Sequence, residues 1–205
     1  MIDSNGKNFL NPVIYIPDEK NVNKIIQSKN SSKKIKHKEN HYFAGTASNP
    51  ESYVTVQISD KKITFDVRGF FQSNLFVFEK TCELIRELRP EWDNVVEMYS
   101  GCGSLSVFAS DKAKTVTLVE HNRDALVMAE INMAGKKHKS YGFSGENWVK
   151  NASSSCPYFD SIIIDPPRSG MEKSVLNYLI KSGAKQIISM SCDPATHGRD
   201  IAVLV

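Results

Sequence analysis

A cysteine follows an aliphatic run near the end of the sequence, in the stretch MSCDPATHGRD (residues 190–200). The run at residues 186–191 has the composition of a strand, so Cys192 stands where that strand should end. Strand ends are where open α/β sheets build active sites. A thiolate is a strong nucleophile, and Arg168 and Arg199 are candidates for a cationic surround that would favour it. We therefore take Cys192 as the candidate nucleophile; the alternative is a buried structural thiol, the commoner use of cysteine.

The residues after the cysteine are of types that often stand at the N-terminus of a helix. Pro194 restricts the backbone, and Asp193 and Thr196 are candidates to hold the loop or to cap a helix that begins near Ala195. This predicts a short, ordered loop that carries the thiol.

A second polar group follows another apolar run. Residues 161–164 read Ser-Ile-Ile-Ile and lead into DPPRSG, so Asp165 stands at a strand end. The two prolines stiffen the backbone and fix where the carboxylate points. A tight turn explains the prolines equally well, but it does not explain why Asp165 and Arg168 flank them. We therefore favour a functional Asp165.

The stretch EMYSGCGS (residues 97–104) follows a third apolar run. Gly101 and Gly103 allow a sharp turn and a close approach of a ligand to the backbone. The pattern is neither GxGxxG nor a P-loop, so a dinucleotide or a nucleoside triphosphate is not the first choice. Glu120 ends the next strand and could accept both hydroxyls of a ribose; the alternative is an exposed acid at a helix start. Together, the turn and the acid predict an adenosine-bearing cofactor.

These groups need a parallel sheet to bring them together. Strands with nearly continuous apolar runs alternate with helical segments, which is typical of a doubly wound α/β sheet. The strands are expected at residues 95–99, 115–119, 141–143, 161–164 and 186–191. The helices are expected at residues 76–88 (closed by Pro90), 105–109, 124–133 and 175–181.

The N-terminal part has a different pattern. Residues 53–58 and 62–67 alternate like strands, with residues 59–61 as a hairpin turn, and residues 12–17 resemble a short strand. The lysine-rich stretch at residues 28–41 is either a solvated loop or a contact to a phosphate backbone. We therefore expect a small β-rich subdomain over residues 1–74 and a second domain over residues 75–205.

Composition sets only broad limits. The net charge of +3 is compatible with a nucleic-acid partner. The four cysteines have no CxxC spacing, no secretory leader precedes them, and no apolar run approaches the ~20 residues of a membrane-spanning helix. These features predict a cytoplasmic protein with free thiols and no metal site.

Four motifs in order resemble the S-adenosylmethionine-dependent RNA uracil-5-methyltransferases over about residues 65–205. The motifs are GFFQSN (69–74), YSGCGS (99–104), DPPRSG (165–170) and SCDPATHGRD (191–200). The resemblance implies a class I methyltransferase (Rossmann-like) domain, preceded by the small β-rich subdomain. It also implies that the substrate is an unpaired uridine of tRNA or rRNA and that the product is 5-methyluridine.

The resemblance implies a role for each matching position. Cys192 would be the nucleophile that adds to carbon 6 of uracil. The S-adenosylmethionine pocket would be lined by residues from several motifs: Gln72, Tyr99, Ser104, Glu120, Asn147 and Asp165, with Gly101 and Gly103 of the glycine-rich turn.

The sequence also departs from the family pattern. Ser100 stands where cysteine is common, Glu97 where aspartate is more usual, and His197-Gly198 where Leu-Ala is frequent. The family's general-base glutamate belongs to a motif beyond the cysteine loop that the 205 residues do not contain, so we expect a catalytic core truncated at its C-terminus. Two alternatives stay open: an amino-group methyltransferase that uses Asp165-Pro166-Pro167, and a noncatalytic module that binds S-adenosylmethionine or RNA.

Overall fold

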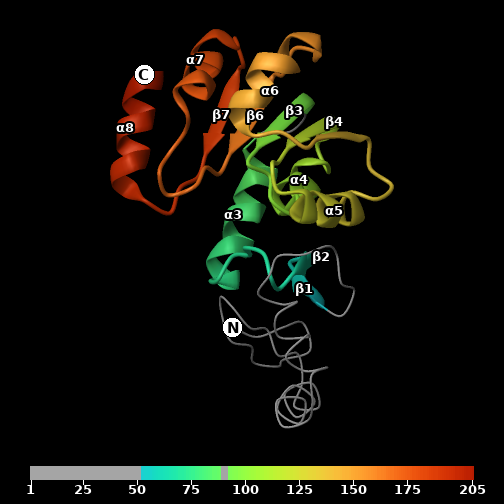
Figure 1. Cartoon of the computed structure of the whole chain (residues 1–205). Coiled ribbons are helices and arrows are strands. Elements are labelled where there is room, and N and C mark those ends of the chain that lie inside the picture. Colours follow the sequence, from blue (N-terminus) through green and yellow to red (C-terminus); the bar gives the residue numbers. More distant parts are fainter. Residues whose placement is uncertain (1–51, 89–91) are drawn as a thin grey trace, which may run out of the picture. The chain divides into compact units, whose positions relative to one another are not determined.

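The computed structural model describes residues 52–88 and 92–205, and the chain divides into two compact units between Thr81 and Cys82 (Figure 1). The strand expected at residues 12–17, the lysine-rich stretch at 28–41 and Pro90 lie outside the described residues. The subdomain boundary near residue 74 stays a prediction. Within the described part of the chain, no helix has the length and apolar character needed to cross a membrane.

The N-terminal unit contains an antiparallel hairpin, as the alternating pattern predicted. Strand β1 (Tyr53–Ile58) pairs with β2 (Lys61–Asp66), and Ile58 lies opposite Lys61. The turn therefore has two central residues instead of the expected three, and its first residue, Ser59, has a φ of 50°. Such left-handed geometry matches the twist of a hairpin.

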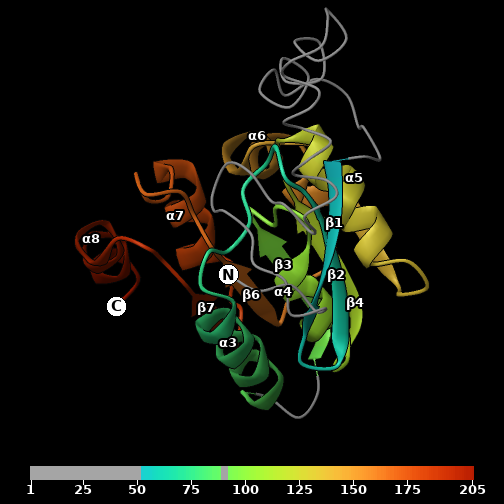
Figure 2. The same cartoon turned by 90° about the horizontal axis from the view of Figure 1, so that it is seen from below.

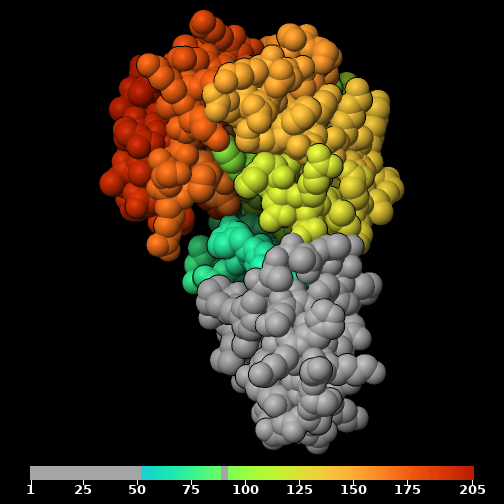
Figure 3. All heavy atoms as spheres, in the orientation of Figure 1, coloured from blue at the N-terminus to red at the C-terminus, as the bar shows by residue number. Residues whose placement is uncertain are grey.

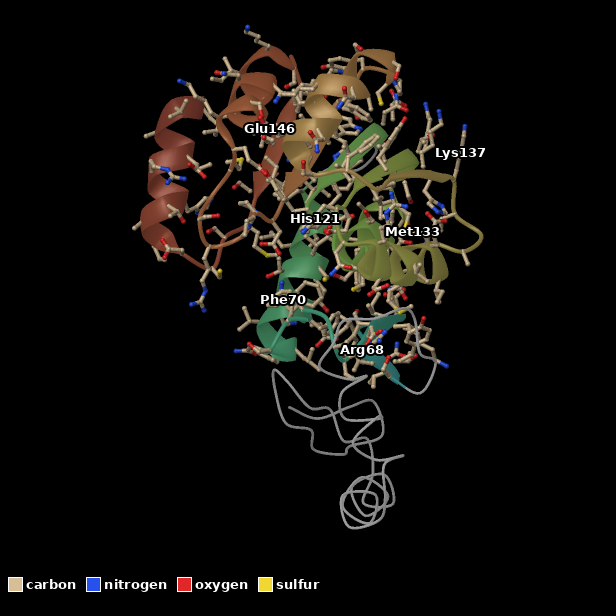
Figure 4. All side chains as sticks on the ribbon, in the orientation of Figure 1. Arg68, Phe70, His121, Met133, Lys137 and Glu146 are labelled. Carbon is tan, nitrogen blue, oxygen red and sulfur yellow. The ribbon has the colours of Figure 1, made fainter. Side chains whose placement is uncertain are left out.

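A buried ion pair and stacked rings stabilise the end of this hairpin. The Phe65 and Phe71 rings stack with centroids 4.0 Å apart. Arg68, which follows β2 (Figure 4), donates to both carboxylate oxygens of Asp66. Burial opposes ionisation of Asp66, but the hydrogen bonds from Arg68 outweigh it and lower the pKa of the carboxyl.

The C-terminal unit is built on a five-stranded sheet of order β5-β4-β3-β6-β7, in which every neighbouring pair is parallel. This confirms the predicted doubly wound α/β fold. The strands are β3 (Trp92–Met98), β4 (Ala113–Val119), β5 (His138–Tyr141), β6 (Ser161–Ile164) and β7 (Gln186–Ser189).

Helices connect the strands and cover both faces of the sheet (Figure 2). Within this sheet, the chain passes first through the central strand β3, then outward through β4 to the edge strand β5, and then to β6 and β7 on the other side of β3. Right-handed crossovers therefore place α4 and α5 on one face and α6 and α7 on the other. The helices are α3 (Leu75–Glu87), α4 (Ser104–Ala109), α5 (Arg123–Asn132), α6 (Gly145–Asn151), α7 (Lys173–Lys181) and α8 (Pro194–Leu204), with a 3-10 turn, η2 (Ser153–Ser155).

The core beneath α6 and α7 is aromatic. The Trp148 side chain is fully buried, with its ring 5.3 Å from the Tyr178 ring and 6.0 Å from the Phe159 ring. Gly145 lies so close to Val175 and Tyr99 that a side chain there would collide with both. This packing holds α6 against the sheet, although the sequence pattern did not predict α6.

The bounds of four strands of the sheet differ from the prediction, and β3 and β4 begin earlier, at Trp92 and Ala113. The first strand ends at Met98 because Tyr99 has a φ of 60°, and the last ends at Ser189 instead of residue 191. The third strand lies at His138–Tyr141 instead of residues 141–143. It is an edge strand with polar residues, so it lacks the apolar run that marks a buried strand.

Candidate active site

The parallel register brings the segments that follow β3, β4, β6 and β7 to one edge of the sheet. Met98 pairs with both Val119 and Ile164, and Ile164 pairs with Ser189. The last residues of β3, β4, β6 and β7 are therefore level with one another. Figure 3 shows the surface hollowed between the segments that follow β4 and β6. An edge of this kind is where doubly wound sheets bind ligands.

The two glycines of the turn after β3 have different surroundings. The Ser100 carbonyl accepts a hydrogen bond from the Gly103 amide at 2.8 Å, which closes the turn. Both glycines have a positive φ, 53° for Gly101 and 71° for Gly103. A Cβ on Gly103 would lie 3.0 Å from Leu118 Cδ2 and 3.1 Å from Ala129 Cβ, whereas a Cβ on Gly101 would meet nothing within 4 Å. Gly103 thus permits close packing of α4, and Gly101 leaves open space beside the backbone.

Glu120 joins the end of β4 to this turn. Its Oε2 accepts from the Gly101 amide at 2.9 Å and its Oε1 from the Asn122 amide at 2.6 Å. The carboxylate is buried, with 7% of the residue exposed. The alternative of an exposed acid at a helix start is therefore wrong, since Asn122 caps α5 instead. Beside it, the exposed His121 places Nδ1 3.1 Å from Glu120 Oε1 (Figure 4).

Glu97 is a second buried acid that the sequence reasoning did not place in the site. It lies on the face of β3 beneath α4, where it accepts a hydrogen bond from the Ser106 hydroxyl. Burial raises the pKa of Glu97 to about 8, and the charges of Asp165 and Glu120 add to the rise. Three carboxyl groups, from β3 and from just after β4 and β6, thus interact. The signal in the sequence was an acid within the apolar run at residues 95–98.

Tyr99 and Ser104 flank the glycine-rich turn. The Tyr99 hydroxyl donates to Glu172 at the start of α7, and burial with this contact raises the Tyr99 pKa. Ser104 is half-buried at the start of α4, and burial raises the pKa of the neighbouring Cys102 thiol. The phenol of Tyr99 therefore ties the end of β3 to α7.

The remaining predicted cofactor residues are more scattered. Asp165 follows β6 directly and is half-buried. Asn147 is exposed in the first turn of α6, which Ser144 caps by accepting from the Asn147 amide. Gln72 belongs to the N-terminal unit, where it is half-buried. The assignment of these three to a cofactor pocket stays a prediction.

Cys192 is exposed on a short loop between β7 and α8. The Ser191 hydroxyl accepts from the Asp193 amide at 3.1 Å, and Asp193 Oδ1 accepts from the Thr196 amide at 2.9 Å. Hydrogen bonds from Thr196 lower the pKa of Asp193, and the Arg168 charge contributes. The predicted cap is confirmed, with α8 beginning at Pro194. These hydrogen bonds hold the backbone of the loop that carries the exposed thiol.

The two arginines predicted to surround the thiol have separate partners. Arg199 pairs with Asp200 at 2.7 Å and donates to the Ser169 carbonyl at 3.0 Å. Arg168 lies close enough to lower the pKa of Asp193. Arg199 therefore acts in the structure as a link between α8 and the segment after β6.

Solved structures share this architecture. The tRNA (uracil-54, C5)-methyltransferase of Pyrococcus abyssi, solved with S-adenosyl-L-homocysteine, superposes with a TM-score of 0.66. The match covers 75% of this chain and 38% of that protein at 24% identity. The likeness establishes the fold, which is that of class I methyltransferases.

Several relatives are similar in sequence. A protein of Treponema denticola named uncharacterized RNA methyltransferase is 40% identical over 166 residues, 73% of this chain and 41% of the relative. A protein of Mycoplasma mobile with the same description is 31% identical over 144 residues, 70% of this chain and 40% of the relative. The chain thus spans about two fifths of the length of these relatives.

A family model matches residues 79–189, which is more than half of the 205 residues. The matched region runs from α3 through β7 and includes the glycine-rich turn, Glu120 and Asp165. The chain therefore belongs to the family described as conserved hypothetical protein 95.

Proposed function

We propose that the chain is the catalytic core of an S-adenosylmethionine-dependent RNA methyltransferase that methylates carbon 5 of uridine through Cys192. One observation carries the proposal: an exposed cysteine follows β7 at the sheet edge where Glu120 and Asp165 follow β4 and β6. The names of the relatives, RNA methyltransferases, support the reaction class. The four motifs, including the cysteine loop, support uracil as the base.

The residues present fit the proposed cofactor. Glu120 Oε2 accepts one backbone amide, from Gly101, and keeps a further lone pair for a ribose hydroxyl, whereas Oε1 accepts the Asn122 amide and lies 3.1 Å from His121 Nδ1. Gly101 faces open space that a side chain would fill. We assign Glu120 to the ribose and Gly101 to backbone contact, with Tyr99, Gly103, Ser104, Asn147 and Asp165 as further members of the pocket. When bound, S-adenosylmethionine supplies an electrophilic methyl group on a sulfonium.

Carbon 5 of uracil is a poor nucleophile, and in the proposed mechanism Cys192 activates it by adding to carbon 6. The Cys192 thiolate forms a bond to carbon 6, and the electrons of the carbon 5–carbon 6 double bond move into an enolate. Carbon 5 then takes the methyl group. Loss of the carbon 5 proton to a base and breakage of the sulfur–carbon 6 bond restore the double bond and release the thiolate.

The proposed partner is RNA with an unpaired target. A uridine inside a duplex is stacked and cannot place carbon 6 against a thiol, so the base must leave its stack. Loop nucleotides in tRNA or rRNA cost least to extrude. A loop uridine is therefore the expected substrate.

The experiment is a covalent trap. The chain is incubated with S-adenosylmethionine and RNA that contains 5-fluorouridine. Fluorine at carbon 5 cannot leave as a proton, so the adduct stops after methyl transfer. We expect a denaturation-resistant complex on a gel, with a methylated nucleotide on the Cys192 peptide in the mass spectrum.

Two variants control the trap. Cys192→Ala should form no adduct, while Cys156→Ala, which removes a half-buried thiol, should form as much as the wild type. Binding of S-adenosylmethionine, measured by calorimetry, should be unchanged in both. An adduct that persists in Cys192→Ala would exclude the covalent mechanism proposed here. Methylation of unmodified RNA by Cys192→Ala would instead favour the amino-group methyltransferase.

A further inference from the structure

Asp200 is a buried carboxylate that joins α8 to the segment after β6. Only 1% of the residue is exposed. Its Oδ2 accepts from the Met171 amide at 2.8 Å, and its Oδ1 accepts from Arg199 Nε at 2.9 Å and Nη2 at 2.7 Å. A buried charge is tolerated when it is paired and hydrogen-bonded in this way. The carboxylate therefore has defined partners on both elements.

Two further bonds connect the same elements. The Thr196 hydroxyl donates to the Arg168 carbonyl at 3.0 Å, and Arg199 Nη2 donates to the Ser169 carbonyl at 3.0 Å. Positions 196, 199 and 200 are spaced i, i+3 and i+4, so these side chains share one face of α8. We call the three side chains Thr196, Arg199 and Asp200 the α8 clasp.

Gly170 shows how closely the clasp holds the segment. It has a φ of 84°, and a Cβ built on it would overlap the Arg199 guanidinium and the Asp200 carboxylate. Its amide donates to the Pro167 carbonyl at 2.8 Å, which closes a turn just after the two prolines. The backbone of this turn thus lies directly against the charged pair, where only glycine fits.

The clasp connects the segments that follow β6 and β7 beyond the point where the backbone hydrogen bonds of the sheet end. The last backbone bond between the two chain segments runs from the Met190 amide to the Ile164 carbonyl, at 2.9 Å. Beyond it, one segment continues with Asp165 and the other with Cys192. The clasp reconnects the two segments a few residues later.

We propose that the α8 clasp is a set of positioning residues that holds the Asp165 segment and the Cys192 loop in one fixed arrangement. The inference rests on the proposed function, in which Asp165 belongs to the cofactor side and Cys192 to the RNA side. The clasp residues contact backbone groups of residues 168, 169 and 171 and thereby set the distance between Asp165 and Cys192. One set of contacts thereby aligns the methyl donor with the carbon that receives it.

The test uses substitutions of one clasp residue. Thr196→Val removes the hydroxyl, which contacts the Arg168 carbonyl at 3.0 Å and also lies 3.2 Å from Asp193 Oδ1 and 3.3 Å from the Asp193 carbonyl. It keeps the backbone amide that Asp193 caps, and Thr196→Ser restores the hydroxyl. Exchange at residues 168–171 therefore separates loss of the Arg168 contact from a change confined to the loop. Val203→Ala, on an exposed position of the same helix, is the matched control. Amide hydrogen exchange of residues 168–171 reports the contact, and the rate of 5-fluorouridine adduct formation reports its effect on the reaction.

The expected result is exchange about tenfold faster at residues 168–171 in Thr196→Val, the scale of one lost hydrogen bond. Adduct formation should slow about tenfold at saturating S-adenosylmethionine. Thr196→Ser and Val203→Ala should match the wild type in both. Unchanged exchange in Thr196→Val would overturn the proposal, as would faster exchange with wild-type adduct formation.

Failure of the proposed function has a different signature. If the wild type forms no adduct, uridine chemistry fails, and the clasp is judged by the rate at which iodoacetamide alkylates Cys192. A changed alkylation rate in Thr196→Val, restored in Thr196→Ser, would uphold the clasp as a positioning device. Equal rates in the wild type and Thr196→Val would overturn it.

Discussion

Glu97 should make the stability of the C-terminal unit depend on pH, and Glu97→Gln should remove that dependence. The carboxyl is buried beneath α4 beside Ser106, and its pKa rises from 4.5 to about 8, chiefly because burial disfavours the charged form. The folded unit therefore holds a proton at neutral pH that the unfolded chain has released.

The sign and size follow from the two pKa values. Below pH 4.5 both states are protonated, and Glu97 has no effect on the pH dependence. Between 4.5 and about 8, unfolding releases a proton, so the free energy of unfolding falls by ~1.4 kcal/mol per pH unit. The loss is complete above the folded pKa and amounts to about 5 kcal/mol over about 3.5 units.

Urea unfolding from pH 5 to pH 9 measures this loss. Both tryptophans, Trp92 and Trp148, are buried in the C-terminal unit, so their fluorescence reports that unit alone. In a plot of the free energy of unfolding against pH, we expect the slope for Glu97→Gln to be smaller than the wild-type slope by the contribution of about one proton. Glu146→Gln, on the surface of α6 (Figure 4), is the matched control and should run parallel to the wild type. If the unfolding free energy of Glu97→Gln changes with pH as steeply as that of the wild type, Glu97 does not hold the proton and the reasoning is refuted.

Four further substitutions test packing, capping and ion pairing, the first three in the same unfolding assay. Gly103→Ala should destabilise the C-terminal unit by about 2–3 kcal/mol because its Cβ meets Leu118 and Ala129, while Gly101→Ala, which also has a positive φ but faces open space, should cost about 1 kcal/mol; equal losses would contradict this difference. Asn122→Ala should cost about 1 kcal/mol because its side chain accepts two amides at the start of α5, and an unchanged midpoint would argue against the cap. In the N-terminal unit, Arg68→Met should leave the Asp66 carboxylate without its charged partner, although the backbone amide of residue 68 still donates to it, and should cost about 3 kcal/mol, monitored by circular dichroism; full stability at pH 7 would contradict a buried pair.

The local chemistry of the chain determined much of this structure. Near-continuous apolar runs predicted β6 and most of β3 and β4, because a buried parallel strand needs apolar side chains on both faces. Asp193 and Pro194 predicted the start of α8, since capping involves residues only three apart. Parallel strands end at a common edge, so the order of strands and helices also predicted that Glu120, Asp165 and Cys192 would approach one another.

Only the tertiary structure decided the contacts between distant residues. The proton on Glu97, the link from Tyr99 to Glu172 and the bond from Asp200 to Met171 each depend on groups from different elements. The edge strand β5 was predicted three residues too far along the chain, because it lacks an apolar run, and helix α6 was not predicted, because its pattern is weak and the burial of Trp148 stabilises it. Local sequence specifies backbone preference and hydrophobic period, whereas burial, charge pairing and side-chain register arise only when the chain has closed on itself.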